Sequence, residues 1–337
     1  MTPSPETGDA AGGLIPVTVQ VDPGARGLRS DQYLAGRLGR ISRSRIHAMF
    51  SRGHVMLDGR RLRAAHRLRG GETLTVWKPA PVAERPLPRI PVLHRDPAFV
   101  VVDKPGDLTV HPTANAHTRT LTAFLQGLEG GPFHPAHRLD RETSGLVVCG
   151  TPGPVSAALK AQFAERTAGK VYLALVAGRL EHPFEVEEPL DFARNSPIHI
   201  KMGVVPGGLP SWSSFTPIVP GDRASLVACR PHTGRQHQLR VHLEWAGHPV
   251  VGDKIYGAPP EWFLEFIETG WTASLADRLL VGRHMLHAAQ LRFAHPVTGE
   301  PCAFFSDAPE DLRAACALLG LACPPPDDLR RLLESTF

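Results

Sequence analysis

The sequence predicts an α+β protein. A large domain around a mixed, largely antiparallel sheet with flanking helices should follow a small N-terminal α/β domain. Five short apolar runs read as strands, and helical segments interrupt them only irregularly, which argues against a doubly wound parallel sheet. A proline-rich stretch at residues 79–90, PAPVAERPLPRI, separates these runs from an arginine-rich segment. This stretch predicts a semi-rigid linker between two domains.

The N-terminal elements follow from local signals. Residues 1–25 are expected to be a flexible tail that holds a short strand at 17–21. Within residues 26–78, SDQYLAGRLG predicts a helix, and SRSRIHAMFSRG predicts a second one because Ile46, Met49 and Phe50 share one face. HVMLDGRRLR predicts a hairpin that turns at Asp58–Gly59, and ETLTVW predicts a closing strand.

The large domain is expected over residues 91–308, and a short helical appendix over 309–337. Its strands are predicted at 99–105, 145–151, 171–178, 225–231 and 291–296, and its helices at 154–166 and 235–247.

Charge is concentrated in the small domain. Residues 26–78 hold 13 of the 37 Lys and Arg residues but only three of the 33 acidic residues. A compact, strongly basic module is typical of a polyanion binder, and arginine forks and stacks on nucleic acid better than lysine does. The alternative is a solvated surface that happens to be rich in arginine.

Composition excludes several protein classes. No apolar run reaches the ~18 residues that a membrane helix needs. The first 13 residues lack the basic-then-apolar order of a signal peptide. The five cysteines are odd in number and show no CxxC spacing, which argues against a disulfide framework and a zinc ribbon. We therefore expect a soluble cytoplasmic protein that has no membrane contact and acts as a monomer.

Charged residues crowd the edge of one predicted strand. In HRLDRETSGL, residues 137–146, Asp140 stands between Arg138 and Arg141 just before a buried run. Such charges are costly to bury without partners. From these residues alone, Asp140 is a helix cap, a member of a structural ion pair, or a catalytic carboxylate.

Several motifs together resemble a known family. They are VVDKPGDLTVHP (101–112), HRLDRETSGLVVCG (137–150), GKVYLALVAG (169–178), RPHTGRQHQLRVHLEWAGHPVVGDKIYG (230–257) and MLHAAQLRFAHPVTGE (285–300). In order and spacing they are similar to the large-ribosomal-subunit (Rlu) type RNA pseudouridine synthases. The arginine-rich module, in turn, resembles the RNA-binding domain first described in the S-four ribosomal protein. The stretch SWSSFTPI (211–218) departs from the synthase pattern.

The resemblance implies that uridine in RNA is isomerised to pseudouridine, with no cofactor and no metal. Asp140 matches the essential aspartate, Tyr172 the tyrosine near the target base, and Arg240 the basic partner of the aspartate. Arg138 matches the arginine that fills the space of the flipped-out nucleotide. Whether the aspartate is a nucleophile or a base stays open.

Further arginines are candidate RNA contacts. Arg235 is expected to contact phosphate, because the HTG turn would leave the next helix N-terminus open to anions; the alternative is a surface residue at a helix start. In the basic module the candidates are Arg43, Arg45, Arg52, Arg60 and Arg61. Ribosomal RNA is the expected partner, and transfer RNA is the alternative.

Two rival functions are compatible with parts of the sequence. A metal-dependent nuclease is suggested by the 17 histidines, but His237 and His242 are five apart on the expected helix, whereas zinc pairs use i and i+4. A non-catalytic RNA-binding protein would need the basic module but not the set of Asp140, Tyr172 and Arg240.

Overall fold

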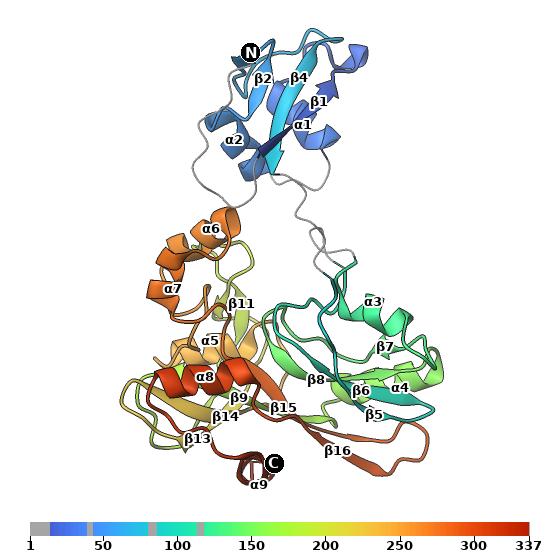
Figure 1. The fold of residues 1–337 in the computed structure, drawn as a ribbon, viewed down its shortest axis with the longest axis vertical. Helices are drawn as coiled ribbons and strands as arrows, with labels where there is room; N and C mark the ends of the chain where they lie inside the picture. Colours follow the sequence, from blue (N-terminus) through green and yellow to red (C-terminus); the bar gives the residue numbers. More distant parts are fainter. Residues whose placement is uncertain (1–13, 39–42, 80–85, 113–117, 337) are drawn as a thin grey trace. The chain divides into compact units, whose positions relative to one another are not determined.

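The computed structural model describes residues 14–38, 43–79, 86–112 and 118–336, and the chain divides into two compact units, Met1–Arg85 and Pro86–Phe337 (Figure 1). Residues 1–13, expected to form a tail, lie outside the described residues. So do the side chains of Arg43 and Arg45. Among the described helices, none is both long enough and apolar enough to cross a bilayer.

The N-terminal unit is a small sheet covered by two helices. Its elements are β1 (Leu14–Gln20), η1 (Pro23–Ala25), α1 (Ser30–Arg37), α2 (Arg43–Ser51), β2 (Val55–Leu57), β3 (Arg60–Arg61) and β4 (Thr73–Pro79). The strand order is β1-β4-β2-β3. The β2–β3 hairpin turns at Asp58 and Gly59, whose φ angles of 51° and 76° suit a two-residue turn. Leu34, Ile46 and Phe50 of the two helices pack into the core of this unit.

The flexible tail predicted over residues 1–25 is too long, because β1 lies within it. β1 pairs with β4 along its whole length, from Leu14 opposite Pro79 to Gln20 opposite Thr73. Val19 and Val21 are buried, whereas Thr18 and Gln20 are exposed. This alternation is short and lies beside a polar terminus, so it does not predict a strand on its own. Pairing with β4 is what makes residues 14–20 a strand.

The second unit is built on a ten-stranded sheet within its described residues. The main path runs β10-β13-β14-β9-β15-β8-β6-β5, with β16 beside β15 and β7 beside β8. Only β15 and β8 run parallel among the pairs of this described sheet, so the predicted mixed, largely antiparallel sheet is confirmed. A separate pair, β11 (Leu190–Phe192) and β12 (Met202–Val204), lies outside this sheet. The other strands are β5 (Val92–Arg95), β6 (Phe99–Lys104), β7 (His134–Pro135), β8 (Ser144–Gly150), β9 (Gly169–Ala177), β10 (Phe184–Val186), β13 (Ser213–Val219), β14 (Ala224–Pro231), β15 (Leu286–Ala294) and β16 (Pro301–Phe305).

Helices cover this sheet in two groups. Within the unit, α3 and α4 lie beside β7 and β8, whereas α5 and α8 lie beside β14 and β9 (Figure 1). The bounds are α3 (Leu121–Gln126), α4 (Pro154–Ala164), α5 (Gln238–Trp245), α6 (Pro260–Thr269), α7 (Ala273–Leu279), α8 (Glu310–Leu318) and α9 (Pro326–Glu334). The strands buried on both faces, such as β8, explain the continuous apolar runs in the sequence.

Two expectations about helices need correction. The helix expected over 235–247 begins only at Gln238, because His237 adopts a left-handed φ of 57° and the Gln238 side chain accepts from the Arg235 backbone N–H. The segment 309–337 is not an appendix, since Leu312, Cys316, Leu329 and Leu333 lie in the main core. Its amphipathic helices bury apolar faces that a short terminal segment does not reveal on its own.

Candidate active site

Asp140 lies in a turn between β7 and β8, where its backbone carbonyl accepts from Thr143 N–H at 3.1 Å. Of its two arginine neighbours in sequence, Arg141 donates through Nε to Asp107 at 2.7 Å, and Arg138 is exposed. Asp140 itself pairs with Arg240, whose Nη1 donates to Oδ2 at 3.1 Å. The Asp140 side chain keeps 26% of its surface exposed, so a substrate can reach the carboxylate.

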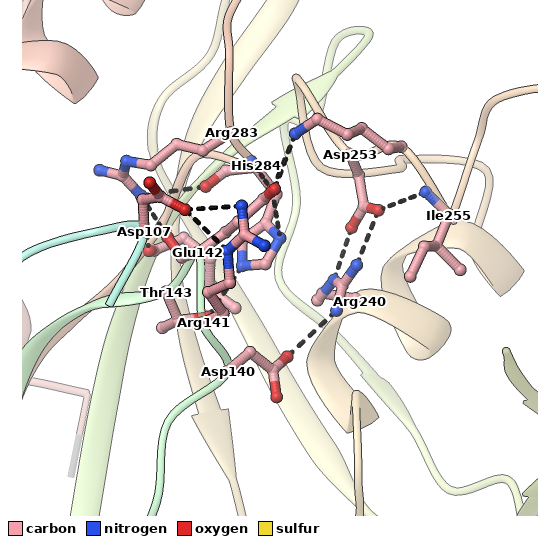
Figure 2. Close-up of polar contacts among 12 residues, drawn as sticks. Asp107, Asp140, Arg141, Glu142, Thr143, Arg240, Asp253, Ile255, Arg283 and His284 are labelled. Atoms are coloured by element: carbon pink, nitrogen blue, oxygen red, sulfur yellow. Dashed lines mark hydrogen bonds and ion pairs between the residues drawn. The ribbon is translucent and has the colours of Figure 1, made fainter. Parts of the chain in front are cut away.

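The Arg240 side chain is held in position by contacts other than the one with Asp140. It projects from α5, and its Nε and Nη2 donate to the two oxygens of Asp253 at 2.6 and 2.8 Å. Figure 2 shows the guanidinium between Asp253 and Asp140. The guanidinium carbon also lies 4.8 Å from the centre of the Tyr256 ring. A bidentate pair of this kind sets the plane of the guanidinium, so the remaining Nη1 is aimed at Asp140.

The charges in this group stabilise one another. Burial alone would lower the pKa of Arg240, but Asp253, and then Asp140, raise it above its ordinary value. For Asp253 the effects have the opposite signs: burial would raise its pKa, but Arg240 and the backbone N–H groups of Ile255 and Tyr256 lower it. Arg240 therefore stays cationic and Asp253 anionic, and a permanent positive charge faces Asp140.

Tyr172 lies on β9, opposite Cys229 of β14 and Ala288 of β15. Its side chain is almost fully buried. Burial, and then the negative charge of Asp140, raise the pKa of the Tyr172 hydroxyl, so the phenol is neutral at physiological pH. Of the expected set, Asp140 and Arg240 are in direct contact, and the charge of Asp140 acts on Tyr172 from a third element.

Two further groups near Asp140, His237 and Lys104, lie within the quoted motifs but were given no role in the reaction from the sequence. His237 Nε2 lies 3.9 Å from Asp140 Oδ2, and its Nδ1 lies 2.8 Å from the Tyr256 hydroxyl oxygen. Burial, and then Arg240, lower the pKa of His237 to about 4, so the imidazole is neutral at physiological pH. Lys104 Nζ donates to the backbone carbonyls of Leu108 and Arg141 at 2.9 and 3.2 Å, and burial lowers its pKa to about 7.

Asp253 is the main residue that sequence reasoning missed. It lies in VVGDKIYG, within a motif that was noted for its family resemblance and not for any charge. The available signal is weak, because an Asp-Lys pair in an apolar stretch must find partners only if it is buried, and the sequence does not show that it is. Its side chain is fully buried.

The expected RNA contacts are dispersed. Arg235 is half-buried, and its Nε donates to the Pro210 carbonyl at 3.2 Å. The open helix N-terminus expected beside it is not there, because α5 starts three residues later and the Gln238 side chain caps the intervening turn. Arg52, Arg60 and Arg61 are exposed on the N-terminal unit.

No group of three His, Cys, Asp or Glu side chains converges as a metal site among the residues that the structure describes. His242, one of the two histidines considered for a metal, lies 3.0 Å from Ser213 Oγ and 3.2 Å from the Glu188 carbonyl. Both of its ring nitrogens thus have partners in the fold.

Comparisons with known proteins identify the family. A family model described as "RNA pseudouridylate synthase" matches residues 98–245. The ribosomal large subunit pseudouridine synthase D of Zymomonas mobilis is 33% identical over 310 residues, which cover 87% of this chain and 94% of that protein. The synthase of the same name from Xanthomonas campestris is 34% identical over 308 residues, 89% of this chain and 91% of that protein.

A solved structure is also similar. The human RNA pseudouridylate synthase domain containing 1 protein superposes with a TM-score of 0.56 at 27% sequence identity, over 73% of this chain and 95% of that one. Sequence similarity along most of the chain and a shared sheet architecture lead to one conclusion. The chain belongs to the RNA pseudouridine synthases, the enzymes that isomerise uridine to pseudouridine.

Proposed function

We propose that this enzyme isomerises specific uridines in large-subunit ribosomal RNA, with Asp140 as its catalytic carboxylate. The target is supported by the names of the relatives that match the chain almost end to end. The carboxylate is supported by one observation above all: a buried, permanently charged Arg240 is aimed at a partly exposed Asp140.

The chemistry needs an ionised carboxylate that is held still. The C1′–N1 bond of uridine must break, and the uracil must rejoin through C5. Asp140 can attack as a nucleophile or remove a proton from the ribose, and the hydrogen bond from Arg240 holds its carboxylate in place for either task. Asp253 contributes indirectly by fixing the plane of the Arg240 guanidinium.

The target base must leave the RNA stack before the carboxylate can reach it. Tyr172 is an almost fully buried aromatic side chain on which the Asp140 charge acts, and we assign to it the contact with the uracil ring. Arg138 is exposed two residues before Asp140, and we assign to it the space that the flipped nucleotide vacates.

The N-terminal unit is proposed to be an S-four-like RNA-binding domain, expected over residues 26–78 and extended in the structure by β1. The linker expected at 79–90 includes residues 80–85, which lie outside the described residues, and the catalytic domain is proposed to start at 91. Arg52, Arg60 and Arg61 would contact phosphate there, together with Arg43 and Arg45. In the catalytic domain Arg235 is proposed to touch the RNA backbone. The proposal includes action as a monomer in the cytoplasm.

Mapping of pseudouridines in total RNA tests this function. A strain without the gene should lose pseudouridine at defined large-subunit positions, and a plasmid copy should restore it. The Asp140→Asn variant should not restore it, although its affinity for RNA should stay within a few fold of wild type because phosphate contacts dominate binding. Loss of pseudouridine from transfer RNA alone would overturn the ribosomal assignment. Residual turnover above about a tenth of wild type in Asp140→Asn would overturn the role of Asp140, since a nucleophile or base is needed for the reaction itself.

A further inference from the structure

A second charged cluster holds the turn that carries Asp140, and the mechanism above does not use it. Glu142 lies two residues after Asp140, and its carboxylate oxygens accept from Lys254 Nζ at 2.8 and 3.0 Å. The His284 backbone N–H donates to the same carboxylate at 3.2 Å. The backbone carbonyl of Glu142 accepts from Arg283 Nη1 at 3.0 Å. Figure 2 shows Glu142 and Asp140 on the same short turn.

Lys254 is committed to this contact. Its side chain is 3% exposed, that of Glu142 17% exposed, and the third donor of the ammonium goes to the Gly282 carbonyl at 2.7 Å. The ammonium also lies 4.7 Å from the Phe266 ring centre and 5.6 Å from that of Trp271. Carboxylate, carbonyl and aromatic faces thus surround one cation, so the position of the Lys254 ammonium is closely defined.

The two clusters share one piece of backbone. Asp253 fixes Arg240, the partner of Asp140, and the next residue, Lys254, fixes Glu142 on the Asp140 turn. Two consecutive residues, Asp253 and Lys254, therefore hold the two sides of the contact between Asp140 and Arg240. A shift of the 253–254 segment would carry both partners together and would leave their separation unchanged.

We propose that Glu142 and Lys254 are positioning residues that hold the Asp140 turn in register with Arg240. This proposal rests on the proposed role of Asp140. Energetics favour it over a purely structural role: a buried ion pair is often no more stabilising than apolar side chains of similar volume, so geometry is the better reason for its presence. Catalysis is sensitive to such geometry, since a displacement of about 1 Å can cost ~10²-fold in rate.

Paired apolar substitutions separate positioning from stability. Glu142→Met or Lys254→Met alone leaves one buried charge without its partner, so each should lower Tm and the rate. The double variant removes both charges and should recover most of the lost Tm. We expect its single-turnover rate at saturating RNA to stay about 10- to 100-fold below wild type, with KM within about threefold.

The matched control is the ion pair between Arg278 and Glu265, which joins α7 to α6 at 2.6 Å and has no direct bond to the Asp140 turn. Its double Met variant should keep the wild-type rate. Recovery of both Tm and rate in the Glu142→Met/Lys254→Met variant would overturn the proposal. If that variant does not fold, Glu142→Gln decides: it keeps the shape but loses the charge, and a rate within twofold of wild type would overturn the proposal equally.

Hydrogen exchange on the free protein tests the same idea without RNA. Backbone amides of residues 141–144 should exchange at least tenfold faster in the double variant, or in Glu142→Gln, whereas amides of β9 should not change. Unchanged exchange at 141–144 would overturn the proposal. Because this measurement needs no substrate, its result does not depend on whether ribosomal RNA is the target.

Discussion

Asp253 offers the sharpest test of the site, because it contacts Arg240 and acts on Asp140 only through that arginine. The substitution Asp253→Asn keeps the shape of the side chain and removes its charge. An asparagine oxygen can still accept from the backbone N–H groups of Ile255 and Tyr256. It can accept only one of the two donors of Arg240, because the amide nitrogen that replaces the second oxygen is itself a donor.

The magnitude follows from burial. Asp253 is fully buried and Arg240 is 5% exposed, so the lost charge leaves a nearly desolvated guanidinium with Asp140 as its remaining anion. Breaking one side of a buried pair costs about 3–5 kcal/mol, and we expect the lower end because one hydrogen bond and the backbone contacts survive. A loss of ~3 kcal/mol corresponds to a Tm decrease of roughly 6–12 °C for a domain of this size. Without both oxygens of Asp253, the Arg240 guanidinium should rotate out of the plane in which it faces Asp140. We expect this displacement to lower the rate of isomerisation about 10²-fold.

The assay pairs thermal unfolding with single-turnover isomerisation. The control is Asp222→Asn, because the Arg179–Asp222 pair has the same 2.6 Å separation but Asp222 is 88% exposed. An exposed pair contributes about 0–1 kcal/mol, so the control should unfold within a few degrees of wild type and react normally. Equal effects of Asp253→Asn and Asp222→Asn would refute the view that Asp253 sets Arg240.

Three other predictions concern RNA contact, domain roles and pH. Arg240→Ala should lower kcat far more than Arg235→Ala, which should mainly raise KM and reduce the salt dependence of binding; equal losses of kcat would contradict this division. A protein without residues 1–80 should match the full chain in single-turnover rate at saturation but need more enzyme at physiological salt, and a hundredfold lower saturated rate would show that the N-terminal unit helps build the active site. Stability should fall as pH drops from about 6.5 to about 4, because the unfolded chain protonates His237 near its ordinary pKa of 6.5 whereas burial holds the folded pKa at about 4. Urea unfolding between pH 7 and pH 4.5 should show a shallower decline for His237→Gln, and parallel curves would exclude His237 as a source.

The sequence was informative where a signal is local or carried by a motif. The hairpin turn at Asp58–Gly59 and the continuously apolar strand β8 are both visible as short patterns, and the structure contains both. The pairing of Asp140 with Arg240 spans 100 residues, and only the resemblance to a known family made it predictable. Physical pattern reading alone left Asp140 between a helix cap, an ion pair and a catalytic group.

The residues that were missed share a physical reason. Asp253 and Lys254 look like an ordinary surface pair in one dimension, and their partners lie 13 and 112 residues away. What buries them is the turn at Gly252, with a φ of 77°, where a Cβ atom would collide with the Arg283 carbonyl. The close approach of that backbone brings β15 and its preceding loop against the Asp140 turn, since Arg283 also donates to the Glu142 carbonyl. A charged pair next to such a glycine therefore indicates burial only when the second backbone is known, and this explains why the anchors of an active site are harder to predict than the carboxylate they hold.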